Sequence, residues 1–393
     1  MATTVAILFV GGAVLASARG GHDGPRRGGD ALEQAWSARG EGQQVLGGTR
    51  TPGVPSVQRL VHDDVTFTVT VAPARPGPNL VRVDSLHQHE KEHRRSDPPV
   101  LVGTTEDDLV PARPRPGTDG LWAVVDLPAG SGTVLVTHGR EHRLPFAVDT
   151  GTDRPDTTAW TGPDGPECLT AATAAVLAGG SAATTCPSDG LHAPDAQALR
   201  ATVATLASRG VEELAVEHDD SARSRAALDL VRGAAEAAGV TIVAPDAAPG
   251  ERNALLVLSG WTAAARDLAA VSSRPLREQP IRSDGTWLAP WLLAPGVVDS
   301  TAGAVIGLDF DIRDPGAQEF SQVLARYLPG QAPTASSYVA WRSARGGDPD
   351  PLTLYAASRA AYLPASDGHA NHETTVAWFP GGTVTPVGAL AAR

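Results

Sequence analysis

Methionine, lysine and cysteine are nearly missing from this sequence of 393 residues, and aromatic residues are few. It has one methionine, two cysteines and 5% aromatic residues, and Lys91 is its only lysine. A metal site built from several methionine thioethers is therefore excluded. With so few aromatic side chains we expect cores of small residues, and the 42 glycines and 32 prolines predict long irregular connections.

An excess of positive charge is also missing. The formal net charge is −12 at pH 7, and the isoelectric point lies near 5.3. This balance argues against nucleic acid as a partner and against a polybasic membrane-surface protein.

Motifs typical of enzymes are absent too. The sequence contains no G-x-x-x-x-G-K-[ST] or G-x-G-x-x-G phosphate loop and no G-x-S-x-G nucleophile elbow. We therefore expect no catalytic residues and predict that the protein is not an enzyme. An enzyme built on the α/β part of the chain is the less favoured alternative.

Only one long apolar run is present, Val5–Ala16, and it ends in an Ala-Ser-Ala pattern. Its length suits the apolar core of a signal peptide and is short of the roughly 20 residues of a membrane span. Arginines follow the run and no basic residue precedes it, and in an uncleaved anchor this asymmetry would favour a cytoplasmic C-terminal part. Residues 1–18 are thus a signal peptide, a membrane anchor, the end of a longer membrane protein's last span, or a buried segment. We predict that the chain lies outside the cytoplasmic membrane, either secreted or tethered to it.

The two cysteines, Cys168 and Cys186, match neither a C-x-x-C redox motif nor a zinc-ligand spacing. An Ala-rich helix and a turn at Gly180 between them would bring them together. We predict a disulfide, as in exported proteins, which would stabilise the fold by about 3 kcal/mol. Two buried free thiols are the alternative.

The chain divides into segments of different pattern. Residues 19–57 are rich in Gly, Arg and Pro and predict a flexible linker. In residues 58–150 Val65, Phe67, Val69 and Val71 alternate with threonines, as in a half-buried strand, and further short strands follow between turns. We predict a small antiparallel β-sandwich there.

Residues 151–393 alternate strands with helices. The predicted helices are 195–209, 221–238, 262–271 and 316–327, and the predicted strands are 213–217, 240–244, 254–259, 287–293, 305–310, 352–357 and 376–387. Near-continuous apolar strands between helices are typical of a mainly parallel α/β sheet. The fold class is therefore mixed, a β-sandwich followed by an α/β domain.

The β-region resembles the immunoglobulin-like extracytoplasmic domain of bacterial copper-resistance membrane proteins. Thr66–Thr70, the turn Pro76–Asn79, the strand beginning Gly120-Leu121-Trp122 and the closing hairpin through Val136 carry this resemblance. It implies an immunoglobulin-like sandwich that handles copper at the membrane.

The α/β region is similar to the second lobe of type I periplasmic substrate-binding proteins of the branched-chain amino-acid kind. Residues Gly210–Gly239, Ala254–Trp261 and Leu308–Trp341 carry the similarity. It implies a small ligand and a membrane transporter as partners. Ala222–Arg225 stands where the family usually has Tyr-Gly, and the chain has no room before Asp195 for the family's full first lobe.

Histidine clusters are the candidate metal ligands. His87, His89 and His93 lie within seven residues among carboxylates, a set that suits copper or zinc. A solvated loop of charged residues is the alternative. A second, weaker candidate is His369 with His372, whose H-x-x-H-E order is not that of zinc proteases.

Candidate ligand-binding residues lie at predicted strand ends, where open α/β sheets bind ligands. These are Asp219 and Ser221 after one strand and Ser259 after another, with Tyr338 lining an aromatic cleft beside tryptophans. The alternatives are helix caps for the polar residues and a core position for Tyr338.

Taken together, the sequence predicts an extracytoplasmic, membrane-associated protein that binds or senses, with transition-metal handling as its specific task. Binding of a small polar solute, such as an amino acid, by the α/β domain is the alternative.

Overall fold

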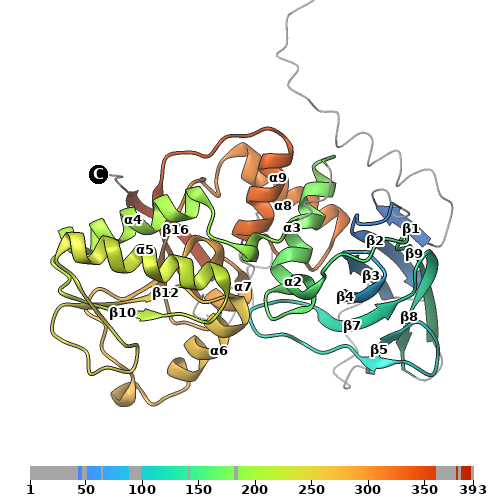
Figure 1. Ribbon diagram of the computed structural model, residues 1–393, viewed down its shortest axis with the longest axis horizontal. Helices are drawn as coiled ribbons and strands as arrows, with labels where there is room; N and C mark the ends of the chain where they lie inside the picture. Colours follow the sequence, from blue (N-terminus) through green and yellow to red (C-terminus); the bar gives the residue numbers. More distant parts are fainter. Residues whose placement is uncertain are drawn as a thin grey trace, which may run out of the picture.

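The computed structural model describes residues 43–46, 51–62, 65–87, 99–139, 142–180, 185–359, 378 and 382–390. Two regions built on different sheets lie side by side in it (Figure 1). Among these residues no helix has both the length and the apolar character that a membrane crossing requires.

The first region consists of two antiparallel sheets. The larger has the strand order β1-β2-β3-β4-β7, with β1 Gln43–Leu46, β2 Ser56–His62, β3 Val65–Ala72, β4 Gly77–His87 and β7 Leu121–Leu127. The smaller has the order β6-β5-β8-β9, with β5 Val100–Gly103, β6 Val110–Pro111, β8 Ser131–His138 and β9 His142–Asp149. Strand β1 lies inside the range 19–57 for which we predicted a linker, and it pairs with β2.

The two sheets pack face to face on one apolar core. The alternating valines of β3 face this core together with Phe146 and Val148 of β9, and all are buried. The threonines of β3 point to the opposite face and are buried as well, since this face of the sheet is covered too. The predicted antiparallel strands are confirmed, whereas the immunoglobulin-like character of the sandwich stays a prediction.

The second region is a seven-stranded sheet of the order β11-β10-β12-β13-β14-β15-β16. Its strands are β10 Glu213–Glu217, β11 Thr241–Val243, β12 Asn253–Val257, β13 Thr286–Leu288, β14 Ala304–Leu308, β15 Thr353–Arg359 and β16 Gly382–Ala389. The first five strands are parallel and the last two pair antiparallel. The predicted α/β class with a mainly parallel sheet is therefore confirmed.

Helices connect these strands and pack on the sheet. They are α4 Ala193–Ser208, α5 Ala222–Ala238, α6 Trp261–Ser272, α7 Pro295–Val298, α8 Pro315–Tyr327 and α9 Ala335–Ala344. Figure 1 shows α4 and α5 side by side, and their residues are in contact. Ser221 caps α5 by accepting a hydrogen bond from the Ser224 amide, and Gly239 ends it in the left-handed conformation, as the sequence indicated.

One predicted strand is too long. The range 287–293 forms a strand only to Leu288, because Pro290 has no amide hydrogen for the sheet and begins a 3₁₀ turn, Pro290–Leu292.

A short helical segment joins the two regions. It comprises α2 Thr158–Thr161, α3 Gly165–Leu177 and the 3₁₀ turn Pro187–Asp189. Helix α3 packs along α9 of the α/β region. Its other side shares a core with the sandwich, formed by Ala72, Leu80, Trp122, Trp160, Cys168, Leu169, Ala172 and Cys186. The segment therefore holds both regions at once.

Candidate functional site

The carboxyl ends of β10, β12 and β13 lie at one edge of the parallel sheet, the place where such sheets bind ligands. The structure brings Asp219, Ser221 and Ser259 together there. Asp219 accepts a 2.7 Å hydrogen bond from the Gly260 amide and a 3.0 Å bond from the Ser221 amide. Its carboxylate thus links the ends of two neighbouring strands.

Ser259 is buried at this edge, and its hydroxyl has no hydrogen-bond partner within the described residues. It is not a helix cap, because Gly260 occupies the N-cap position of α6. Its carbonyl accepts a 3.0 Å bond from the Trp291 indole, and the Trp261 indole donates to the Trp291 carbonyl at 2.7 Å. The two indoles therefore fix the ends of β12 and β13 against each other.

Tyr338 occupies a different place. It is 4% exposed, and its ring packs among Phe310, Phe320, Trp341 and Trp378. This is the core position that we gave as the alternative to a cleft. In the part of the chain that the structure describes, no contact joins Tyr338 to Asp219.

The strongest polar interaction at this edge is one that the sequence did not predict. Glu167 of α3 binds Arg223 of α5 through two parallel hydrogen bonds, Oε1–Nη1 at 2.8 Å and Oε2–Nη2 at 2.7 Å. The side chains are 0% and 2% exposed. The hydroxyl of Ser336 donates to Glu167 as well, and the Arg223 guanidinium lies 4.5 Å from the centre of the Trp291 ring.

The charges of Glu167 and Arg223 also influence the pKa values of nearby carboxyl groups, those of Asp164, Asp195 and Asp219. Burial, reinforced by the charge of Glu167, raises the pKa of Asp164 to about 6, although Arg223 opposes the change. Burial likewise raises the pKa of Asp195 to about 7 against the attraction of Arg223. Burial would also raise the pKa of Asp219, but the hydrogen bonds from Gly260 and Ser221 outweigh it and leave that pKa below its usual value.

The start of α3 covers this edge of the sheet. The Asp164 carboxylate lies against Gly260, where an added Cβ would meet Asp164 Oδ2 at 2.1 Å. Thr262, in the first turn of α6, donates a 2.9 Å bond to the carbonyl of Pro163. The segment that begins α3, the helix that carries Glu167, therefore lies against the residues that follow β12.

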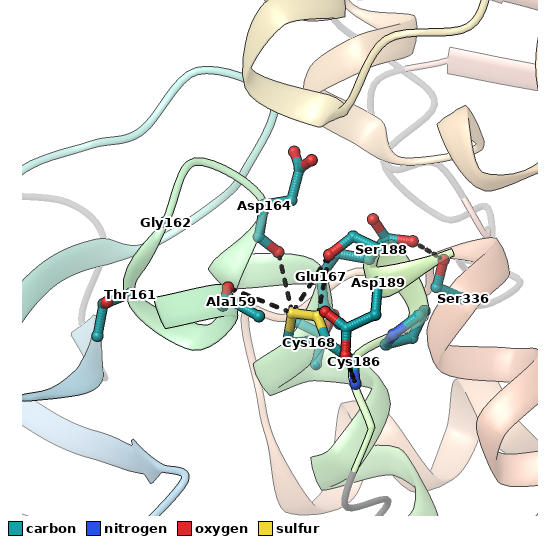
Figure 2. The surroundings of a disulfide bond; sticks show 12 residues. Ala159, Thr161, Gly162, Asp164, Glu167, Cys168, Cys186, Ser188, Asp189 and Ser336 are labelled. Carbon is teal, nitrogen blue, oxygen red and sulfur yellow. Dashed lines mark hydrogen bonds between the residues drawn. A yellow bond between two sulfur atoms is a disulfide. The ribbon is translucent and has the colours of Figure 1, made fainter. Parts of the chain in front are cut away.

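The predicted disulfide between Cys168 and Cys186 is present. Figure 2 shows it beside Glu167, which precedes Cys168 in α3 and points toward Ser336. Cys168 Sγ lies 3.4 Å from the carbonyl oxygen of Asp164. The carbonyl of Pro187, next to Cys186, accepts a 3.5 Å hydrogen bond from Arg223 Nη1. The disulfide thus fixes the helix that carries Glu167 next to Arg223.

Most of the predicted metal ligands fall outside the described residues, namely His89, His93, His369 and His372. His87 is the last residue of β4, and its backbone pairs with Val65. Within the described ranges, no group of three or more His, Cys, Asp or Glu side chains is arranged to hold a metal ion. Copper or zinc binding stays a prediction.

Surface hollows lie away from the strand ends. One of about 510 Å³ is lined by residues 246–251, 253 and 277–281, near the opposite edge of the sheet. Another of about 300 Å³ lies between β4, the Gly120–Leu121 turn and Pro329–Gly330, where the two regions meet.

The chain thus combines two antiparallel sheets with a mixed α/β fold whose sheet is mainly parallel. No family model matches the chain, and no curated protein matches it. Solved structures similar to it include ABC transporter substrate-binding proteins of the type I periplasmic class.

Three of these illustrate the likeness. A substrate-binding protein of Desulfitobacterium hafniense in complex with leucine is 16% identical, with a TM-score of 0.28, over 39% of this chain and 50% of its own. A solute-binding protein of R. palustris in complex with benzoate is 13% identical, with a TM-score of 0.33, over 50% and 64%. A third, from Rhodopseudomonas palustris and in complex with 3,4-dihydroxybenzoic acid, is 14% identical, with a TM-score of 0.34, over 51% and 66%. The chain spans less than two thirds of the length of each.

Proposed function

We propose that this chain is an exported, non-enzymatic binding protein whose α/β region takes a small solute bearing a carboxylate at the ends of β10, β12 and β13. One observation carries the proposal, namely the buried carboxylate-binding position at Arg223, which Trp291 and Ser336 border. A planar guanidinium that donates two parallel bonds, stacks on the Trp291 indole and has the Ser336 hydroxyl nearby is the donor set that holds a carboxylate best.

In the structure the side-chain carboxylate of Glu167 occupies this position and binds Arg223. A solute would bind by taking its place as the first turn of α3 moves aside. Because Glu167 competes for Arg223, the apparent affinity for a free carboxylate is reduced in proportion to the fraction of molecules in which Arg223 is not bound to Glu167.

Export is supported by the disulfide, which persists in oxidising compartments. A tether at the membrane and a transporter as partner belong to the same proposal. They rest on the apolar run at Val5–Ala16 and on the resemblance of the α/β region to periplasmic binding proteins.

The test removes the internal carboxylate. Benzoate, leucine and acetate are titrated by calorimetry into the wild type and into Glu167→Gln and Glu167→Ala. We expect both variants to bind carboxylates at least about tenfold more tightly than the wild type does, because the competitor is gone. Benzamide should bind to neither, since it lacks the charge.

Two controls keep the result interpretable. The Glu212→Gln variant removes a carboxylate from an exposed ion pair with Arg252 in the same region and should leave carboxylate binding unchanged. The Arg223→Met variant should abolish it. If Glu167→Gln is folded by circular dichroism and still binds none of the three carboxylates, the proposed solute site is wrong.

A further inference from the structure

Three consecutive residues between α2 and α3, Gly162–Asp164, are each in contact with a residue from elsewhere in the chain. They lead directly into α3, the helix that carries Glu167, and Figure 2 shows Gly162 and Asp164 in this loop. We call the segment Gly162–Asp164 the strap. Its contacts decide how freely the first turn of α3 can move.

The first contact of the strap comes from the sandwich. Arg115, in the connection between β6 and β7, donates a 2.9 Å hydrogen bond from Nη1 to the carbonyl of Gly162. The same carbonyl accepts a 3.1 Å bond from the amide of Gly165, the first residue of α3. The connection that carries Arg115 also lies tightly against the α/β region, since a Cβ added to Gly117 would meet the carbonyl oxygen of Trp261. The sandwich therefore fixes the strap at its first residue.

The other two contacts come from the start of α6. The hydroxyl of Thr262 donates a 2.9 Å hydrogen bond to the carbonyl of Pro163. The carboxylate of Asp164 lies against Gly260, the N-cap residue of α6, whose amide donates to Asp219. The strap is thus tied to the sandwich at one end and to the strand ends of the parallel sheet at the other.

Two buried side chains limit how far a movement of the strap can spread. Trp160 precedes the strap and Cys168 follows it, and both belong to the core that α3 shares with the sandwich. Cys168 is also fixed by its disulfide to Cys186. A movement that takes Glu167 away from its partner is therefore confined to residues 161–167.

We propose that Arg115 and Thr262 are positioning residues of the solute site, which hold the strap and thereby keep Glu167 on Arg223. The inference rests on the proposed function and gives the sandwich a part in it, because the sandwich supplies Arg115. Breaking either hydrogen bond makes the displaced state of the first turn of α3 easier to reach, so a free carboxylate meets less competition at Arg223. Access to the solute site is then set by two side chains that touch neither the solute nor Arg223.

The first experiment titrates benzoate by calorimetry into Arg115→Gln and Thr262→Val. Each change removes one hydrogen bond to the strap, and we expect the affinity for benzoate to rise about two- to tenfold, the factor by which one hydrogen bond shifts an equilibrium. In a Glu167→Ala background the same changes should leave the affinity unaltered, because no internal carboxylate is left to compete. Arg113→Gln, changed at an exposed arginine of the same connection, is the control and should bind benzoate as the wild type does.

Hydrogen exchange followed by mass spectrometry tests the strap without any ligand. The amides of Glu167 and Cys168 donate to the carbonyl of Asp164, and local opening of the first turn of α3 exposes them. We expect exchange about two- to tenfold faster over residues 162–168 in Arg115→Gln and Thr262→Val. Exchange over residues 171–177, the later part of α3, should stay as in the wild type.

The outcomes separate this inference from the solute site on which it rests. Unchanged exchange over residues 162–168 in both variants would overturn the positioning role, as would an unchanged or lower benzoate affinity while Glu167→Ala binds benzoate. A gain in affinity that persists in the Glu167→Ala background would overturn it as well, since the strap would then act without Glu167. If folded Glu167→Ala binds no carboxylate, both the solute site and the positioning role are wrong. Should Arg115→Gln prove unfolded by circular dichroism, Thr262→Val, which keeps the size of the side chain, decides alone.

Discussion

Glu167 and Arg223 lie 56 positions apart in the sequence, yet their side chains form a two-bond ion pair that is almost completely buried. Removing one partner leaves an uncompensated charge in the protein interior. We expect Glu167→Gln or Arg223→Met to lower the free energy of unfolding by about 3–5 kcal/mol, and the double variant to recover much of that loss. Urea denaturation of the four proteins measures the coupling between the two residues.

The exposed pair Glu212–Arg252 is the matched control. Its partners are 71% and 65% exposed, and breaking it should cost at most about 1 kcal/mol. Equal losses at the two pairs would show that the Glu167–Arg223 pair is solvated in solution.

Stability should depend on pH through Asp164 and Asp195. Their pKa values are raised to about 6 and about 7 in the folded protein, so the folded state holds protons that the unfolded chain has released. The two groups therefore contribute stability that is fully present below pH 4 and is lost as the pH rises through 7. Urea denaturation between pH 4 and 8 should show this decline, and Asp195→Asn should remove its upper part.

Asp108 provides a comparison of opposite sign. Hydrogen bonds from Thr104 and Thr105 lower the pKa of its carboxyl to about 2, so its contribution is lost only as the pH falls below about 4. The Asp108→Asn variant should keep the decline between pH 4 and 8. A pH profile that stays flat in the wild type would contradict the burial of Asp164 and Asp195.

The disulfide should stabilise the packing of α3 against the sandwich, where the two regions meet. Cys168 and Cys186 belong to the core that α3 shares with the sandwich. We expect Cys168→Ser/Cys186→Ser to lose about 3 kcal/mol of stability, because an 18-residue loop is no longer closed in the unfolded chain. Thermal unfolding with and without reductant measures this. Reductant should destabilise the wild type and leave the variant unchanged, since the sequence has no other cysteine.

Two glycines test how closely the sandwich approaches the α/β region. Gly117 and Gly130 both have positive φ angles, of 79° and 86°. A Cβ at Gly117 would lie 2.6 Å from the carbonyl oxygen of Trp261, whereas one at Gly130 would meet nothing within 4 Å. We expect Gly130→Ala to cost about 1 kcal/mol from backbone strain and Gly117→Ala to cost clearly more. Equal costs by chemical denaturation would mean that the Gly117 loop does not contact α6 in solution.

Much of the fold was predictable because local periodicity and burial agree. The alternation of Val and Thr in β3 and the capped helix after Ser221 follow directly from their residues, and both are found. The strand predicted over 287–293 was wrong beyond residue 288. Its apolar residues 290–292 form a buried 3₁₀ turn, and an apolar run alone does not distinguish a buried turn from a buried strand.

The candidate site was predicted only in part. Asp219, Ser221 and Ser259 follow strands and could be placed at one edge from the sequence. Glu167 was missed because its partner is distant in the chain, and no local pattern encodes such a contact. A signal did exist at Arg223, since a cation in the first turn of a helix opposes the helix dipole and needs a compensating anion.

Helix α3 packs on the sandwich with one side and on α9 with the other. Receptors made of two lobes commonly report a ligand by rotating one lobe against the other, with a change in their dimensions. Here such a rotation would have to break the packing of α3 on one side. The arrival of a solute is therefore expected to leave the radius of gyration unchanged and to be signalled by local rearrangement of the residues around Asp164.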